Sequence, residues 1–92
     1  MSDIIIRRQH GKNLAEARAS AEHMAAELKE EFDLDYIWIG NVMRFKRPGV
    51  AGELSVNDQT VALNIRLGLL LFALKPAIER EIHRFFDENF PS

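Results

Sequence analysis

The hydrophobic residues change their spacing near residue 33, and this change constrains the fold more than any other feature of the sequence. Up to residue 32 they recur three or four positions apart, as on one face of a helix. The residues of this stripe are Leu14, Ala17, Ala21, Met24, Ala25, Leu28 and Phe32. Asn13 and Glu16 resemble a capping box, so we expect a helix over residues 13–32. From Asp35 onward apolar and polar residues alternate, which is typical of half-buried strands.

The strand pattern begins with a hairpin around Gly40-Asn41, a two-residue turn whose first position tolerates a positive φ. The turn fixes which residues face each other across the hairpin. The expected pairs are Ile39 with Val42, Trp38 with Met43, Ile37 with Arg44, Tyr36 with Phe45 and Asp35 with Lys46. We expect the face that carries Tyr36, Trp38 and Phe45 to point into the core.

Three further strands are expected. Residues 4–9 form the first strand, and residues 53–56 and 60–67 form a second hairpin around Asn57-Asp58, with Leu54 opposite Val61. Residues 47–52 contain one proline and two glycines and are not expected to continue a ladder cleanly.

A closing helix is expected from residue 69 to residue 89. Its buried stripe is Leu71, Leu74, Ile78, Ile82, Phe85 and Phe86. Pro76 lacks a backbone N–H and interrupts the pattern, so the helix either kinks there or begins afresh.

These elements predict a single α+β domain over residues 1–92, with the order β-α-β-β-β-β-α. We expect a two-layer sandwich in which two helices cover one face of a five-stranded antiparallel sheet. The first connection contains a helix and can cross the sheet, so the expected strand order is 1-5-4-3-2. This arrangement resembles a reduced helix-grip fold, in which a long C-terminal helix lies across a curved sheet.

Composition and charge exclude several classes of protein. The chain has 12 basic and 14 acidic residues and a net charge of -2, so no overall field draws it to nucleic acid. It has no cysteine and therefore no disulfide or thiolate metal site. The apolar residues are dispersed, and the start lacks the apolar run of a secretory signal, so we expect no membrane span and a cytoplasmic location.

The sequence shows no catalytic or metal-binding constellation. The three histidines, His10, His23 and His83, have no common metal-ligand spacing, and no serine lies in a nucleophile motif. We therefore expect no catalytic residue, no metal and no cofactor, and no enzyme. Arg44, Lys46 and Arg66, with Arg47 and Lys12 near in sequence, could form a basic strip. Alternation puts the aromatic residues on the opposite face from Arg44 and Lys46, so a solvated face is expected.

Two groups of apolar residues are candidates for an interaction surface. Leu69, Phe72 and Ala73 point away from the stripe of the closing helix, so they are either buried between the sheet and the first helix or exposed to a partner. Ile37, Ile39 and Val42 lie on the nominally outer face of the sheet. Two apolar faces on one hairpin favour a homodimer.

Four sequence segments resemble the polyhydroxyalkanoic acid system proteins, small bacterial proteins encoded with genes for polyhydroxyalkanoate storage granules. The segments are Ile4-x-Ile6-x-Arg8-x-His10-x-x-x-Leu14, Trp38-x-Gly40-Asn41-x-x-x-Phe45, Pro48-Gly49-Val50-x-Gly52-x-Leu54-x-Val56 and Leu67-Gly68. The family commonly has aspartate after the central glycine, where this chain has Asn41. These are turn and core positions, so the resemblance implies a fold and a context and supplies no active site.

Two functions from different classes follow. The resemblance implies a non-catalytic accessory protein of polyhydroxyalkanoate metabolism, with the granule surface or granule proteins as partners. The helix-grip order and the row Tyr36, Trp38 and Phe45 instead favour a module that holds an acyl-type ligand between helix and sheet.

Overall fold

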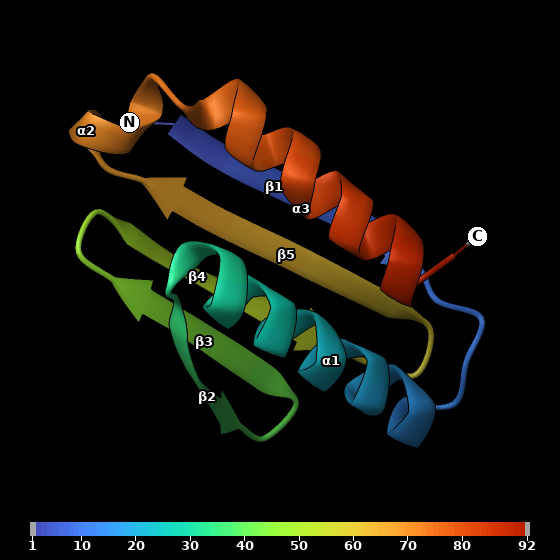
Figure 1. The fold of residues 1–92 in the computed structure, drawn as a ribbon. Coiled ribbons are helices and arrows are strands. Elements are labelled where there is room, and N and C mark those ends of the chain that lie inside the picture. Colours follow the sequence, from blue (N-terminus) through green and yellow to red (C-terminus); the bar gives the residue numbers. More distant parts are fainter. Residues whose placement is uncertain (1, 92) are drawn as a thin grey trace.

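One five-stranded antiparallel sheet runs through the structure, a computed structural model that describes residues 2–91 (Figure 1). The strands are β1 (Ser2–Gln9), β2 (Asp35–Ile39), β3 (Val42–Arg47), β4 (Val50–Val56) and β5 (Thr60–Leu67). Their order is β1-β5-β4-β3-β2, which confirms the predicted order. The strands β1 and β2 therefore form the two edges.

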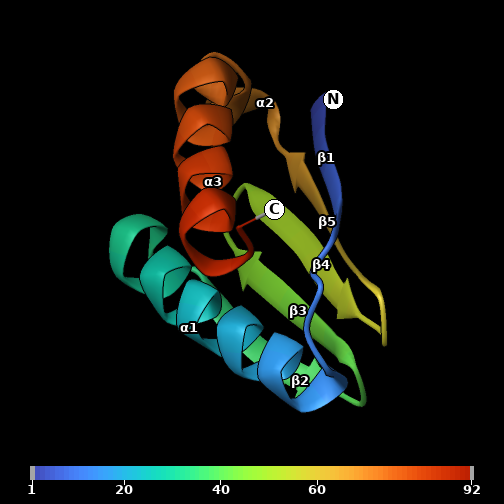
Figure 2. The ribbon, with the colours of Figure 1, turned by 90° about the vertical axis from the view of Figure 1, so that its right-hand side faces the viewer.

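Two long helices, α1 (Leu14–Phe32) and α3 (Lys75–Asn89), cover one face of the sheet, and within residues 2–91 no helix lies on the other face (Figures 1 and 2). The connection from β1 to β2 carries α1 across the sheet. A third helix, α2 (Leu69–Phe72), is a single short turn between β5 and α3. The predicted two-layer α+β architecture is confirmed, and among the described residues no helix is long and apolar enough to span a membrane.

The helix α1 has the predicted cap at its start and an unpredicted one at its end. The Asn13 side chain accepts a hydrogen bond from the Glu16 N–H at 2.8 Å, and Glu16 accepts one from the Asn13 N–H. At the C-terminal end, Arg47 of β3 donates to the carbonyl of Phe32 at 2.6 Å. A guanidinium at this position satisfies a free carbonyl and opposes the negative end of the helix dipole.

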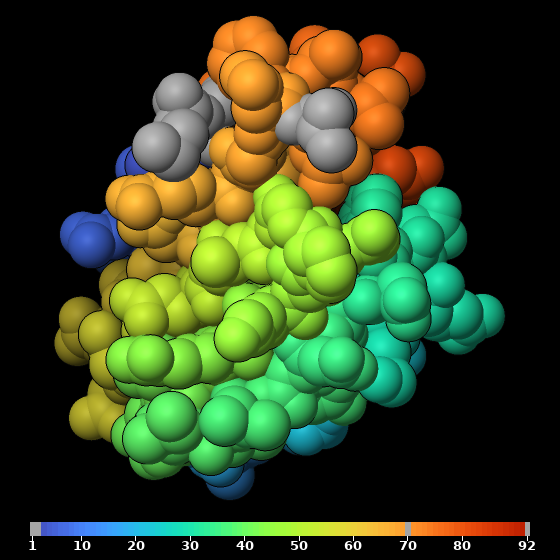
Figure 3. All heavy atoms as spheres, turned by 90° about the vertical axis from the view of Figure 1, so that its left-hand side faces the viewer, coloured from blue at the N-terminus to red at the C-terminus, as the bar shows by residue number. Residues whose placement is uncertain are grey.

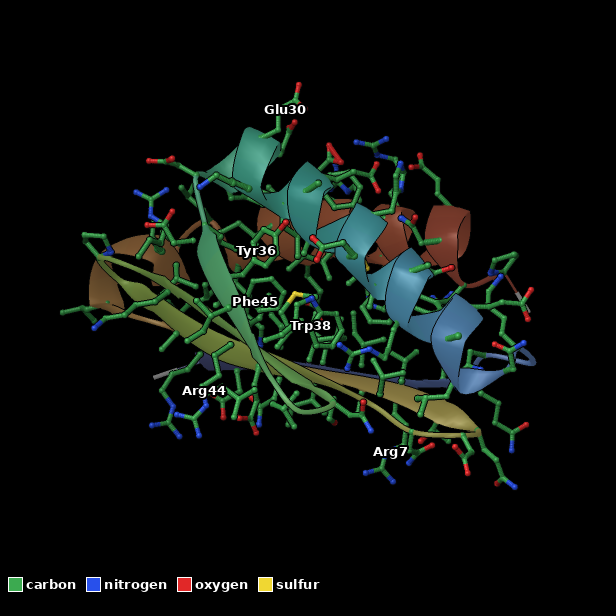
Figure 4. All side chains as sticks on the ribbon, turned by 90° about the horizontal axis from the view of Figure 1, so that it is seen from below. Arg7, Glu30, Tyr36, Trp38, Arg44 and Phe45 are labelled. Carbon is green, nitrogen blue, oxygen red and sulfur yellow. The ribbon has the colours of Figure 1, made fainter. Side chains whose placement is uncertain are left out.

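The first hairpin has the predicted turn and the predicted register. Gly40 has a φ of 62°, which glycine adopts without steric cost. Ile39 pairs with Val42, and the pairing continues to Asp35 with Lys46. The aromatic residues of this hairpin and Arg44 therefore lie on opposite faces, as Figure 4 shows for Trp38 and Arg44.

The predicted register of the second hairpin is wrong by two residues. Leu54 pairs with Leu63 rather than with Val61. The loop is longer than a two-residue turn because the Asn57 side chain accepts hydrogen bonds from the backbone N–H groups of Gln59, at 2.9 Å, and Thr60, at 2.7 Å. A shift of two residues leaves every side chain on its predicted face.

The strand β4 begins earlier than predicted, so the expectation that residues 47–52 interrupt the ladder is wrong. Pro48 and Gly49 form a two-residue turn in which Gly49 has a φ of 85°, and Val50 already pairs with Arg47. Gly52 lies inside the strand. A Cβ atom at Gly52 would come within 2.6 Å of the Asn64 carbonyl oxygen on β5, so this close approach excludes any larger residue.

The closing helix is divided into α2 and α3, which confirms the predicted alternative that a helix begins afresh at Pro76. The helix α3 begins at Lys75 with Pro76 in its first turn, where no N–H is needed. Leu74 precedes α3 and is 53% exposed, so its assignment to the buried stripe is wrong. The later stripe residues Ile82, Phe85 and Phe86 are buried between α3, the sheet and α1.

Candidate interaction surface

The short helix α2 presents apolar side chains at one corner of the sheet. The Gly68 N–H donates to the Gly49 carbonyl at 2.7 Å, which ties the end of β5 to the β3–β4 turn. The half-buried side chain of Leu71 lies 3.5 Å from the point where Gly49 would carry a Cβ atom. Because Leu71 fills the inward position, Leu69 and Phe72 are left on the outside of this turn.

Among the side chains that the structure describes at this corner, three large apolar ones are exposed, and we call them the α2 apolar cluster: Leu69 at 88%, Phe72 at 52% and Leu74 at 53%. Ala73 between them is also exposed. Figure 3 shows the α2 segment in orange beside the start of β4. This exposure excludes the alternative in which the helix start is buried on two sides, and Leu74 is the member that the sequence missed.

A second exposed apolar group lies on the uncovered face of the sheet. Ile37 is 62% exposed, Ile39 is 55% exposed and Val42, which pairs with Ile39, is half-buried. These residues are exposed at the positions that the alternation predicts. Ile5 of β1, on the same face, is 69% exposed and was not among the predicted candidates.

The predicted basic strip is interrupted by acids. Arg44, Lys46 and Arg66 line an open hollow of about 920 Å³ on the uncovered face of the sheet. Glu53 also lines it and pairs with Arg44 in the register of β3 and β4. Arg47, which also lines the hollow, donates to the Phe32 carbonyl at the end of α1. The mixed charges of this hollow do not form the uniform positive surface that tracks a nucleic-acid backbone.

The predicted ligand-binding row Tyr36, Trp38 and Phe45 lies between α1 and the sheet (Figure 4). Glu22 of α1 accepts hydrogen bonds from the hydroxyl of Tyr36 and from the Trp38 Nε1–H, the latter at 2.9 Å. Phe45 is only 2% exposed. The polar atoms of Tyr36 and Trp38 thus bind α1 to β2. Sequence spacing could not reveal this contact, because Glu22 lies far from the row in the chain.

Arg18 completes this contact one helical turn before Glu22. Its guanidinium lies 4.1 Å from the Trp38 ring centroid and donates to the Gly40 carbonyl at 2.7 Å and to Asn41 Oδ1 at 2.8 Å. The cation therefore stacks on the indole while it binds the hairpin turn.

The contact with Glu22 changes the acidity of Tyr36. The hydrogen bond to Glu22, followed by burial and the nearby negative charge, raises the pKa of Tyr36 above its usual value of 10.0. Because the neutral phenol is the favoured form, this contact stabilises the fold at lower pH, and the contribution is lost as the pH rises through the raised pKa.

We therefore expect the absorbance of tyrosinate at 295 nm to appear with a midpoint above 10.0. The chain contains one tyrosine, so the signal is unambiguous. Replacing Glu22 with alanine should move the midpoint back down, whereas Glu30→Ala, at an exposed residue of α1, should leave it unchanged. Circular dichroism at each pH reports whether the fold persists. A wild-type midpoint at or below the usual value would contradict this contact.

Two of the histidines make structural hydrogen bonds. His10 is 3% exposed, with Nε2 2.7 Å from the Asn57 carbonyl oxygen and Nδ1 accepting from the Lys12 N–H at 3.0 Å. His23 Nδ1 lies 2.6 Å from Oδ1 of the buried Asn89 and links α1 to α3. In residues 2–91 no group of three or more potential ligands is placed to hold a metal ion.

Comparison with known proteins identifies the family. The model of the family described as "Putative polyhydroxyalkanoic acid system protein" matches residues 4–90. No curated protein and no solved structure matches the chain. The matched range extends from β1 to the end of α3 and includes the turns at Gly40 and Gly49. The chain therefore belongs to the polyhydroxyalkanoic acid system protein family, as its four sequence segments predicted.

Proposed function

We propose that the protein is a non-catalytic accessory protein of bacterial polyhydroxyalkanoate storage that attaches to the granule surface through the α2 apolar cluster. The observation that carries this proposal is the exposure of Leu69, Phe72 and Leu74 at one corner of a member of this family. The helix α2 has no charged residue in its first or last turn.

The α2 apolar cluster and the polymer of the granule are chemically compatible. A polyhydroxyalkanoate carries ester groups and short alkyl chains, without charge and without hydrogen-bond donors within the chain. A matching protein surface therefore needs apolar side chains more than it needs ionic groups. Complete burial of a fully exposed leucine or phenylalanine side chain contributes roughly 1.5–3 kcal/mol. Phe72 and Leu74 are about half exposed, so burial of the α2 apolar cluster contributes a few kcal/mol to binding such a surface.

The cellular test compares fluorescent fusions in granule-forming and granule-free cells. We expect the wild type to collect on granules and the Leu69→Glu/Phe72→Glu variant to stay diffuse, because a charge loses its hydration in an apolar contact. Both positions are exposed, so the variant should fold. A diffuse wild type in granule-forming cells would contradict the proposal, as would a variant that still collects on granules.

The second predicted function, an acyl-ligand module, remains a prediction. The hydroxyl of Tyr36 and the indole N–H of Trp38 both donate to Glu22, so neither polar group is free to orient a ligand. No contact of the aromatic row favours this function over packing.

A further inference from the structure

The strand β1 lies at the edge of the sheet, and one side of its backbone faces away from β5 (Figures 1 and 2). The N–H of His10 donates to the Gln59 carbonyl at 3.0 Å, one position beyond the pair Gln9 with Thr60. Bonded pairs alternate along an antiparallel ladder, so the even-numbered residues of β1 bond to β5. The odd-numbered residues direct their N–H and C=O groups to the open edge.

The odd-numbered residues Asp3, Ile5 and Arg7 also place their side chains on the uncovered face of the sheet. Ile5 is 69% exposed, and Arg7 is exposed and points away from the helices (Figure 4). Asp3 lies 3.6 Å from Arg66, and its side chain is still 38% exposed. An acid, an isoleucine and a base therefore follow one another at equal spacing along an open edge.

We propose that two copies of this chain pair through β1, antiparallel and with a two-fold axis at Ile5, so that two five-stranded sheets become one. In this register Asp3 of each copy lies opposite Arg7 of the other, and the two Ile5 side chains meet at the axis. The backbone groups of all three residues then bond across the edge. If this symmetric pairing is shifted by two residues, some of the backbone hydrogen bonds remain, but Ile5 then lies opposite Arg7 or Asp3. The centred register instead places opposite charges across from each other and is therefore favoured.

The other edge of the sheet lacks this complementarity. The outward residues of β2 are Asp35, Ile37 and Ile39, with one acid and no base. Symmetric pairing about Ile37 would set Asp35 against Ile39. The homodimer expected from the sequence is thus assigned to β1, where opposite charges meet, rather than to the Ile37 and Ile39 face. This assembly goes beyond granule attachment and is tested without granules.

The test is the association state of the purified chain in sedimentation velocity. The wild type should be a dimer that dissociates on dilution. Arg7→Asp places two acids opposite each other and should weaken association about tenfold or more, whereas Arg7→Lys keeps a positive charge opposite Asp3 and should keep the dimer. Circular dichroism verifies the fold of each variant.

Proline at residue 5 provides an independent test. The N–H of Ile5 faces the open edge, so Ile5→Pro removes no bond to β5, and proline is tolerated on an edge strand. The variant should fold and remain a monomer. A monomeric wild type at every concentration would overturn the proposal, as would an Arg7→Asp or Ile5→Pro variant that dimerises as strongly as the wild type.

Discussion

Replacing Gly52 with valine is expected to lower the melting temperature by about 15 °C or more. A Cβ atom at this position would lie 2.6 Å from the Asn64 carbonyl oxygen and 3.0 Å from the Ile65 Cα atom, so the side chain meets backbone that cannot move without breaking the β4–β5 ladder. Overpacking of this kind costs about 3 kcal/mol, out of roughly 5–15 kcal/mol for a whole domain.

Ala51→Val is the matched control for Gly52→Val. Ala51 is adjacent on β4, and its side chain is exposed on the uncovered face. A β-branched residue suits a strand, so this change should alter the free energy of unfolding by less than about 0.5 kcal/mol. Thermal melts of both variants distinguish steric overlap from a general intolerance of valine in β4. Equal melting temperatures for the two variants would show that the strands do not approach as closely at Gly52.

The second large effect is expected for Phe86→Ala. Phe86 is completely buried. The centroid of its ring lies 5.7 Å from that of Phe90 and 5.6 Å from the guanidinium carbon of Arg8. Truncation of a buried phenylalanine leaves a cavity and costs about 3–5 kcal/mol in the free energy of unfolding. Urea denaturation should therefore show a much lower midpoint than for the wild type.

The same substitution at Phe72 provides the comparison for Phe86. Phe72 is 52% exposed, so Phe72→Ala should cost less than about 1 kcal/mol. The contrast tests which of the two phenylalanines belongs to the core and which to the α2 apolar cluster. A loss at Phe72 as large as that at Phe86 would place Phe72 in the core and remove it from the proposed surface.

The parts of the fold that the sequence predicted correctly depend on interactions between residues close together in the chain. The capping box at Asn13 and Glu16 starts α1, and Gly40 with its positive φ fixes the register of the first hairpin. The β5 register was missed because Asn57 lengthens its loop through side-chain hydrogen bonds, which a dipeptide pattern does not specify.

The candidate surface was predicted only in part because exposure depends on tertiary contacts. The spacing placed Leu74 on the buried stripe, yet α3 begins anew after it, and the side chain is exposed. Sequence spacing also left the row of Tyr36 and Trp38 available to a ligand. Glu22, which occupies both donors, comes from another element that folding brings to the row.

The most direct test of granule attachment is cosedimentation of the purified chain with washed, protein-free polyhydroxyalkanoate particles. The wild type is predicted to bind, and Leu69→Glu/Phe72→Glu to bind at least about a hundredfold more weakly. Ile37→Glu/Ile39→Glu places the same charges on the other exposed apolar group and should bind like the wild type. A wild type that stays in the supernatant, or equal binding by the Leu69→Glu/Phe72→Glu variant, would contradict attachment through the α2 apolar cluster.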